Sequence, residues 1–246
     1  VHSMKDVPVE LPPGLEITIT PQREDPRDVL ISRDGLMIET MPPGARIGTG
    51  SLRRGIQIRN RMPQLEVAPI RGNLDTRIRK VSEGLLDGVL VAAAGMKRMG
   101  WEDRISQFLP PDIVLPAACQ GILGIETRQG DSLRDALTFL HDPETGVELS
   151  GERAFLRRLG GGCQLPVAVF AQKTGELIHI EALVGSLDGK TVIRQDIFGP
   201  AADASELGDK LAVDILDRGG REILAEVYFA EPRHHQHYFK HNPSGD

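Results

Sequence analysis

The fold class can be predicted from residues 45–93, ARIGTGSLRRGIQIRNRMPQLEVAPIRGNLDTRIRKVSEGLLDGVLVAA. Short apolar runs at 45–49, 65–70 and 88–93 predict strands, and the intervening segments 52–61 and 73–86 carry the spacing of helices. Asn73 is of the residue type that caps a helix N-terminus. Alternating strands and helices predict a mainly parallel, doubly wound α/β sheet with helices on both faces.

Further strands are predicted on either side of this unit. Residues 15–20 and 28–32 are rich in β-branched side chains, which favours strands before it. A third strand is predicted at 119–126 and a helix at 132–140. Between them and the central unit lies a connector, 101–116, that contains Pro110, Pro111 and Pro116. The prolines indicate a crossing between domains.

The last third of the chain has a different pattern. A helix predicted at 143–159 is followed by Gly160-Gly161-Gly162, as helices often end at glycine. Strands at 167–173, 177–185 and 190–198 are joined by Thr174-Gly175 and Asp188-Gly189, which are hairpin signals. Helices at 204–218 and 221–228 complete a small α+β domain with a three-stranded antiparallel sheet. Beyond it, residues 231–246 have the composition of a disordered terminus; no cysteine or carboxylate pattern joins their four histidines to suggest a metal site.

Composition limits the classes of function. The 246 residues carry a net charge of −6, which argues against nonspecific nucleic-acid binding. No apolar run is long enough to span a bilayer, and the first residues contain no apolar signal segment. Two cysteines do not make a disulfide framework, which favours a reducing cytosol.

The charge is unevenly distributed along the chain. Residues 46–80 contain nine basic side chains against two acidic ones, a local charge of +7 in an acidic protein. A basic stretch of this kind predicts a local anion site, although for any single arginine a solvated helix face is the alternative.

Four segments together identify a family. They are His2-Ser3-Met4-Lys5-Asp6-Val7-Pro8, Gly48-Thr49-Gly50-Ser51-Leu52-Arg53-Arg54, Arg71-Gly72-Asn73 with Arg77, and Gly161-Gly162-Cys163-Gln164-Leu165-Pro166. Supporting segments are 23–28 (REDPRD), 95–98 (GMKR) and 152–154 (ERA). In order and spacing they resemble the porphobilinogen deaminases (hydroxymethylbilane synthases), over residues 1 to about 228. The resemblance implies a transferase of haem and chlorophyll biosynthesis that deaminates four porphobilinogen molecules, joins them head to tail and releases hydroxymethylbilane.

The resemblance also implies the chemistry of two residues. Cys163 would carry a dipyrromethane cofactor through a thioether, with no metal. Asp6 would be the catalytic carboxylate. Loss of ammonia from porphobilinogen leaves an electron-poor carbon with positive charge spread onto the pyrrole nitrogen, and a fixed anion stabilises that charge where it develops. The same carboxylate can help to move protons.

Further residues are implied as ligand contacts. Porphobilinogen carries an acetate and a propionate, and guanidinium groups pair with carboxylates bidentately. Ser51, Arg53 and Arg54 lie at a predicted helix N-terminus, which favours anions. The cofactor-binding set is Lys5, Thr49, Ser51, Arg53, Arg54, Arg71 and Gln120, and the substrate-binding set is Arg77, Arg98 and Arg153.

The fold implied by the resemblance has two doubly wound lobes similar to periplasmic binding proteins and a third, α+β domain. Residues 1–23 with 118–141 would form the first lobe, 24–117 the second and 142–230 the third domain. The first lobe lacks at least one βαβ unit, so we expect an N-terminally truncated chain, cytosolic and monomeric. Gly50 stands where the family usually has serine. Two alternatives stay open: an inactive fragment of this enzyme, and a two-lobe anion-binding module that performs no chemistry.

Overall fold

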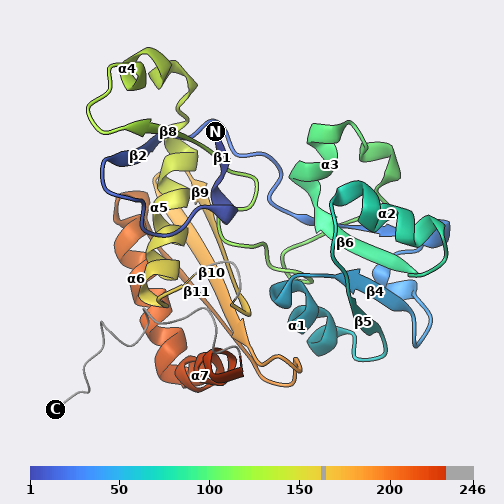
Figure 1. Ribbon diagram of the computed structural model, residues 1–246. Coiled ribbons are helices and arrows are strands. Elements are labelled where there is room, and N and C mark those ends of the chain that lie inside the picture. Colours follow the sequence, from blue (N-terminus) through green and yellow to red (C-terminus); the bar gives the residue numbers. More distant parts are fainter. Residues whose placement is uncertain (162–164, 231–246) are drawn as a thin grey trace.

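The computed structural model describes residues 1–161 and 165–230, with side chains up to residue 227. Two sheet-containing halves stand side by side (Figure 1), joined by two extended segments. One half holds a five-stranded sheet with helices α1, α2 and α3. The other holds two three-stranded sheets and helices α4 to α7. Within the described residues no helix combines the length and apolar composition needed to cross a membrane.

The five-stranded sheet has the order β5-β4-β6-β3-β7. Its strands are β3 (Asp28–Ser32), β4 (Arg46–Thr49), β5 (Glu66–Pro69), β6 (Gly88–Ala92) and β7 (Gln107–Leu109). Strand β4 pairs in parallel with β5 and β6, whereas β3 pairs antiparallel with β6 and β7. The expectation of a mainly parallel sheet is therefore wrong for β3. The connection from β3 to β4 contains single 3-10 turns and no crossover helix to carry the chain back to the same end of the sheet. Strand β3 therefore runs opposite to β4 and to β6, which lies between them.

Helices cover both faces of this sheet, as the doubly wound pattern predicts. Helix α1 (Leu52–Arg61) contributes Ile58 to a core that includes Leu30 and Ile47. Helices α2 (Leu74–Ser82) and α3 (Ala93–Met99) pack on the other face, where Val81 and Met96 join the alternate side chains of β3 and β6. Asn73 caps α2 by accepting from the Thr76 N–H at 2.9 Å, but the helix ends at Ser82, four residues before the predicted end.

A small antiparallel sheet, β1-β8-β2, lies in the other half. Its strands are β1 (His2–Ser3), β2 (Leu15–Ile19) and β8 (Leu123–Arg128), followed by α4 (Leu133–Leu137) and a 3-10 turn to Leu140. Strand β8 begins four residues later than predicted because the chain turns first: Cys119 and Gly121 have φ angles of 61° and 87°.

The C-terminal sheet matches its prediction closely. Its strands are β9 (Val167–Thr174), β10 (Leu177–Gly185) and β11 (Val192–Pro200), in the antiparallel order β11-β10-β9. The four alternate side chains predicted to face the core, Ile178, Ile180, Ala182 and Val184, are fully buried. Helices α5 (Pro143–Arg158), α6 (Ala204–Ile215) and α7 (Arg221–Ala230) cover that face. The predicted disordered terminus, residues 231–246, lies outside the described residues.

Two segments, 20–27 and 110–122, connect the halves and touch each other. The Glu24 N–H donates to the Gly121 carbonyl at 3.0 Å. A Cβ at Gly121 would lie 2.3 Å from the Glu24 carbonyl oxygen, so only glycine permits this approach. The crossing predicted from the prolines is thus a paired crossing, with its two extended segments in backbone contact.

Candidate active site

The site begins at the turn that leads from β4 into α1. The Ser51 side chain caps α1 by accepting from the Arg54 N–H at 3.5 Å, and the Thr49 hydroxyl accepts from the Ser51 N–H at 3.1 Å. A Cβ at Gly50 would stand 2.6 Å from the Ile70 carbonyl oxygen. Glycine at this position therefore fits the close approach of these two backbone segments.

Arg53 and Arg54, on the first turn of α1, are buried, with 4% and 6% of their surfaces exposed. Both bind the carboxylate of Asp28, which is fully buried at the start of β3. Arg53 Nη1 reaches Asp28 Oδ2 at 2.6 Å, and Arg54 Nη2 and Nε reach Oδ1 at 2.7 and 2.9 Å. The sequence predicted both arginines at the site but not this partner.

The Asp28 carboxylate is ionised despite its burial. Burial alone would raise the pKa of Asp28, but the charges and hydrogen bonds of Arg53 and Arg54 outweigh it and hold the pKa far below its usual value. The Gln120 amide adds a further donor at 3.0 Å and also donates to the Pro26 carbonyl at 2.7 Å. Gln120 therefore fastens one crossing segment to the other beside the arginines.

Lys5 and Asp6 approach from the opposite half of the molecule, on a one-turn 3-10 helix, Met4–Asp6. Met4 anchors this turn by packing with Cys119 and Ile122, and its N–H donates to the Ile122 carbonyl at 2.9 Å. The Asp6 carboxylate is exposed. Burial lowers the pKa of Lys5 below its ordinary value of 10.5, and the positive charge of Arg54 lowers it further.

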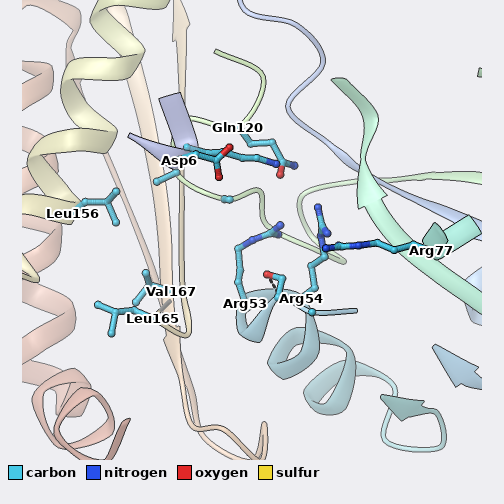
Figure 2. A pocket seen from close by; sticks show the side chains of 13 residues that line it. Asp6, Arg53, Arg54, Arg77, Gln120, Leu156, Leu165 and Val167 are labelled. Carbon is cyan, nitrogen blue, oxygen red and sulfur yellow. Dashed lines mark hydrogen bonds between the residues drawn. The ribbon is translucent and has the colours of Figure 1, made fainter. Parts of the chain in front are cut away.

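A cavity of about 260 Å³ lies among the side chains of Lys5, Asp6, Arg53 and Arg54 (Figure 2). Arg77 of α2 enters it from the side of the five-stranded sheet, and Leu156 of α5 and Val167 of β9 line the far wall. Burial, followed by the charge of Arg54, lowers the pKa of the Arg77 guanidinium. Of the predicted site residues the cavity brings together Lys5, Asp6, Ser51, Arg53, Arg54, Arg77 and Gln120.

Four other predicted residues do not line the cavity described here. Thr49 is buried behind the turn, where it holds Ser51, and Arg71 and Arg98 are exposed. Arg153 of α5 donates to the carbonyls of Pro8 and Val9 at 2.8 and 2.5 Å, so it supports the loop that follows Asp6. Cys163, the predicted attachment residue, lies outside the described residues.

Three charged residues near the cavity were not predicted as site residues from the sequence. Asp28 holds the arginine pair, and Arg23 and Glu152 form a buried ion pair at 2.8 Å beside the crossing. The one available signal was the charged run 23–28 next to a predicted domain crossing, since charged residues are seldom clustered at a buried junction without partners.

The arrangement is chemically specific. Three arginines and a lysine line the cavity and make it electropositive, although Arg53 and Arg54 are paired with the buried Asp28. Asp6 is the acidic group in the lining. Such a cavity binds a small ligand with several carboxylates, and it presents one exposed carboxylate, Asp6, to the ligand.

Comparisons with known proteins agree with this chemistry. Residues 1–135 match the family model described as porphobilinogen deaminase, dipyromethane cofactor binding domain, and residues 147–217 match the porphobilinogen deaminase C-terminal domain. The chain is 55% identical to the porphobilinogen deaminase of Syntrophus aciditrophicus, with 94% of this chain and 76% of that protein aligned. The protein of the same name from Syntrophobacter fumaroxidans is 47% identical over 94% of this chain and 75% of its own length. That from Geobacter sulfurreducens is 46% identical over 94% and 73%. The chain therefore belongs to the porphobilinogen deaminase family.

Proposed function

We propose that this chain deaminates four porphobilinogen molecules, joins them head to tail on a dipyrromethane attached to Cys163, and releases hydroxymethylbilane. One observation carries the proposal: Asp6, an exposed carboxylate, stands at a cavity whose other charged lining groups are cations. A ligand rich in carboxylates and pyrrole N–H groups is the chemical complement of that combination.

The residues present fit a dipyrromethane. Arg53 Nε is buried and has no acceptor among the described residues. Buried donors are normally paired, so this N–H can donate to a ligand oxygen. Within the described chain the Arg77 guanidinium makes a single hydrogen bond, from Nε to the Gly72 carbonyl at 2.7 Å, and its terminal nitrogens remain for a ligand. Lys5, Ser51, Arg53 and Arg77 would hold the group. When bound, it supplies the pyrrole end to which the first substrate is joined.

The chain's own residues then bind and orient the substrate. Arg77 and Lys5 pair with acetate and propionate groups, and the N-terminus of α1 adds free N–H groups and a favourable dipole. Fixing the carboxylates fixes the ring, which brings the aminomethyl carbon of porphobilinogen to the same position in each cycle.

Asp6 acts on the pyrrole nitrogen. As ammonia leaves porphobilinogen, positive charge spreads to that nitrogen. The Asp6 carboxylate accepts a hydrogen bond from the pyrrole N–H and so stabilises the charge. After the new carbon–carbon bond has formed, the ring must lose a proton to regain aromaticity, and the same carboxylate can accept it.

We also propose that the protein works as a monomer in the cytosol, where the Cys163 thiol stays reduced until the cofactor is attached. We further propose that residues 1–23 and 118–141 form one lobe and residues 24–117 the other. Residues 142–230 would form the third domain. The paired crossing, with its Glu24–Gly121 backbone contact, supports hinge motion that makes room for the growing product.

The test is turnover of porphobilinogen by the chain and by Asp6→Asn. We expect the variant to keep its Tm and to lose about 10²–10⁴-fold in kcat, as for loss of a general acid–base group. Asp103→Asn is the matched control, because Asp103 is also exposed on a one-turn 3-10 helix, Glu102–Arg104, outside the cavity. Normal turnover in Asp6→Asn contradicts the role, and binding without turnover in the parent chain identifies an anion-binding module instead.

A further inference from the structure

We propose that Asp28 acts on the ligand only through Arg53 and Arg54, as their resident counter-ion. Its carboxylate occupies the inner edges of Arg53 and Arg54, so that the pair offers a ligand one net positive charge and holds each ligand carboxylate only loosely. The inference deepens the proposed function and rests on it.

The first support is the geometry of the arginine pair. Asp28 Oδ1 accepts from both arginines and from Gln120, and Oδ2 accepts from Arg53, so the carboxylate is saturated by protein donors. A ligand carboxylate cannot take the same edges of the guanidiniums without displacing Asp28. In the described chain this leaves a ligand Arg53 Nε, which has no acceptor, and the second hydrogens of Arg53 Nη2, Arg54 Nη1 and Arg54 Nη2.

The second support is that the arginines have other anchors. Arg53 Nη1 also donates to the Leu115 carbonyl at 2.7 Å, and Arg54 Nη1 donates to the Leu90 carbonyl at 3.0 Å. Gln57 reinforces this framework by bonding to the Leu115 carbonyl and N–H. Because carbonyls and the helix already place the guanidiniums, the distinctive contribution of Asp28 is its charge.

The third support is the demand made by the reaction. Each added ring brings two further carboxylates, and the product must shift through the same cavity and finally leave. Two uncompensated, desolvated guanidiniums would hold a carboxylate strongly, because charges interact far more strongly when water is excluded. Tight binding of a ground state lowers KM without raising kcat, and it slows the steps that require movement.

The experiment compares Asp28→Asn with the parent in two measurements. The first is the affinity for succinate, a plain dicarboxylate, by calorimetry at constant ionic strength. The second is KM and kcat for porphobilinogen. We expect Asp28→Asn to bind succinate about tenfold more tightly or better, since one compensating charge is gone. We also expect its KM and kcat to fall together.

Asp25→Asn is the matched control. Asp25 lies in the same segment and holds Arg27 at 2.7 and 2.9 Å, but neither residue lines the cavity. Its succinate affinity and KM should equal those of the parent. A purely structural role for Asp28 lowers kcat or stability but does not tighten succinate binding, so unchanged or weaker binding in Asp28→Asn overturns the proposal.

A second background keeps the test decisive if Asp28→Asn alone does not fold. In the variant Arg53→Gln, Asp28 neutralises the charge of Arg54 alone. The double variant Arg53→Gln/Asp28→Asn should therefore bind succinate about tenfold more tightly than Arg53→Gln. No tightening in that background also overturns the proposal. The succinate measurement does not depend on turnover, so failure of the proposed function, with no porphobilinogen consumed by the parent, is recognised separately.

Discussion

Arg23 and Glu152 meet in a buried ion pair, with Arg23 Nη1 2.8 Å from Glu152 Oε1. Glu152 is fully buried on α5 and also accepts from the backbone N–H groups of Cys119 and Ala171. Arg23 Nε donates in turn to the Gln120 carbonyl at 3.0 Å. One pair of charges therefore joins both crossing segments to α5, the helix that leads toward Cys163.

Removing Arg23 should be costly for stability. Arg23→Ala leaves the Glu152 carboxylate buried without its counter-charge, which costs about 3–5 kcal/mol. Chemical denaturation measures the loss. Arg158→Ala is the control, because Arg158 makes a pair with Asp209 at 2.6 Å on the exposed side of the same helix. An exposed pair contributes about 0–1 kcal/mol, so equal losses in the two variants would contradict the account.

The contact of the two crossing segments predicts a second stability effect. Gly121→Ala puts a methyl group 2.3 Å from the Glu24 carbonyl oxygen and must push the segments apart. Gly130→Ala has a similar positive φ, 75° against 87°, but meets nothing within 4 Å. The control thus pays the backbone strain of about 1–2 kcal/mol without the clash, and Gly121→Ala should unfold at a clearly lower denaturant concentration. Equal midpoints would show that the close approach is unimportant.

Arg77 should act on ligand binding. Arg77→Ala is expected to raise KM for porphobilinogen by about tenfold or more, because a hydrogen bond to a charged group contributes about 1.5–3 kcal/mol. Arg79→Ala, on the same helix but exposed and paired with Glu83 at 3.5 Å, should leave KM unchanged. Steady-state kinetics separates the two variants, and a KM for Arg77→Ala equal to that of the parent would remove Arg77 from the site.

Lys5 should make anion binding depend on pH. Burial and Arg54 lower the pKa of Lys5 below 10.5, and a bound carboxylate raises it again, so binding takes up a proton. Succinate affinity should therefore fall as pH rises through the lowered pKa of Lys5, and Lys5→Arg, which stays charged, should abolish that fall. Lys190→Arg, at a position that is 86% exposed, serves as the control and should keep it. A parent affinity that stays constant as pH rises to 10.5 contradicts the assignment.

The same shift has a consequence for folding. In the unfolded chain Lys5 keeps its ordinary pKa, so between the two values the unfolded state binds more protons than the folded state. This group therefore makes the protein more stable as pH rises through that window. The unfolding free energy of Lys5→Met should lack this contribution.

Local patterns in the sequence predicted most elements that lie within the described residues. Helix 52–61 and strands 28–32 and 177–185 have the predicted bounds, because each combines a clear periodicity with a distinct boundary residue. The direction of β3 was not predictable in this way, since periodicity reports which face is buried and not which neighbour a strand selects. The turn at Cys119 was also missed, because a cysteine with a positive φ carries no local signal.

The site was predicted through residue types, and its partners were not. Arg53 and Arg54 were expected to offer their guanidiniums to a ligand, yet Asp28, 25 and 26 residues away, takes both. In the sequence Asp28 ends the charged run 23–28 and begins a predicted strand, and nothing in that pattern indicates which side chains it binds. Burial and the convergence of distant charges arise only when the crossing segments fold against α1, so a single sequence does not reveal them.

A chain that builds a porphobilinogen deaminase site should carry a dipyrromethane on Cys163. The intact mass of the purified chain, beside that of Cys163→Ala, tests it most directly. We expect the parent to be heavier than its sequence mass by one dipyrromethane and the variant to have the mass of its sequence alone. A parent without the added mass, or a variant that retains it, would contradict the claim.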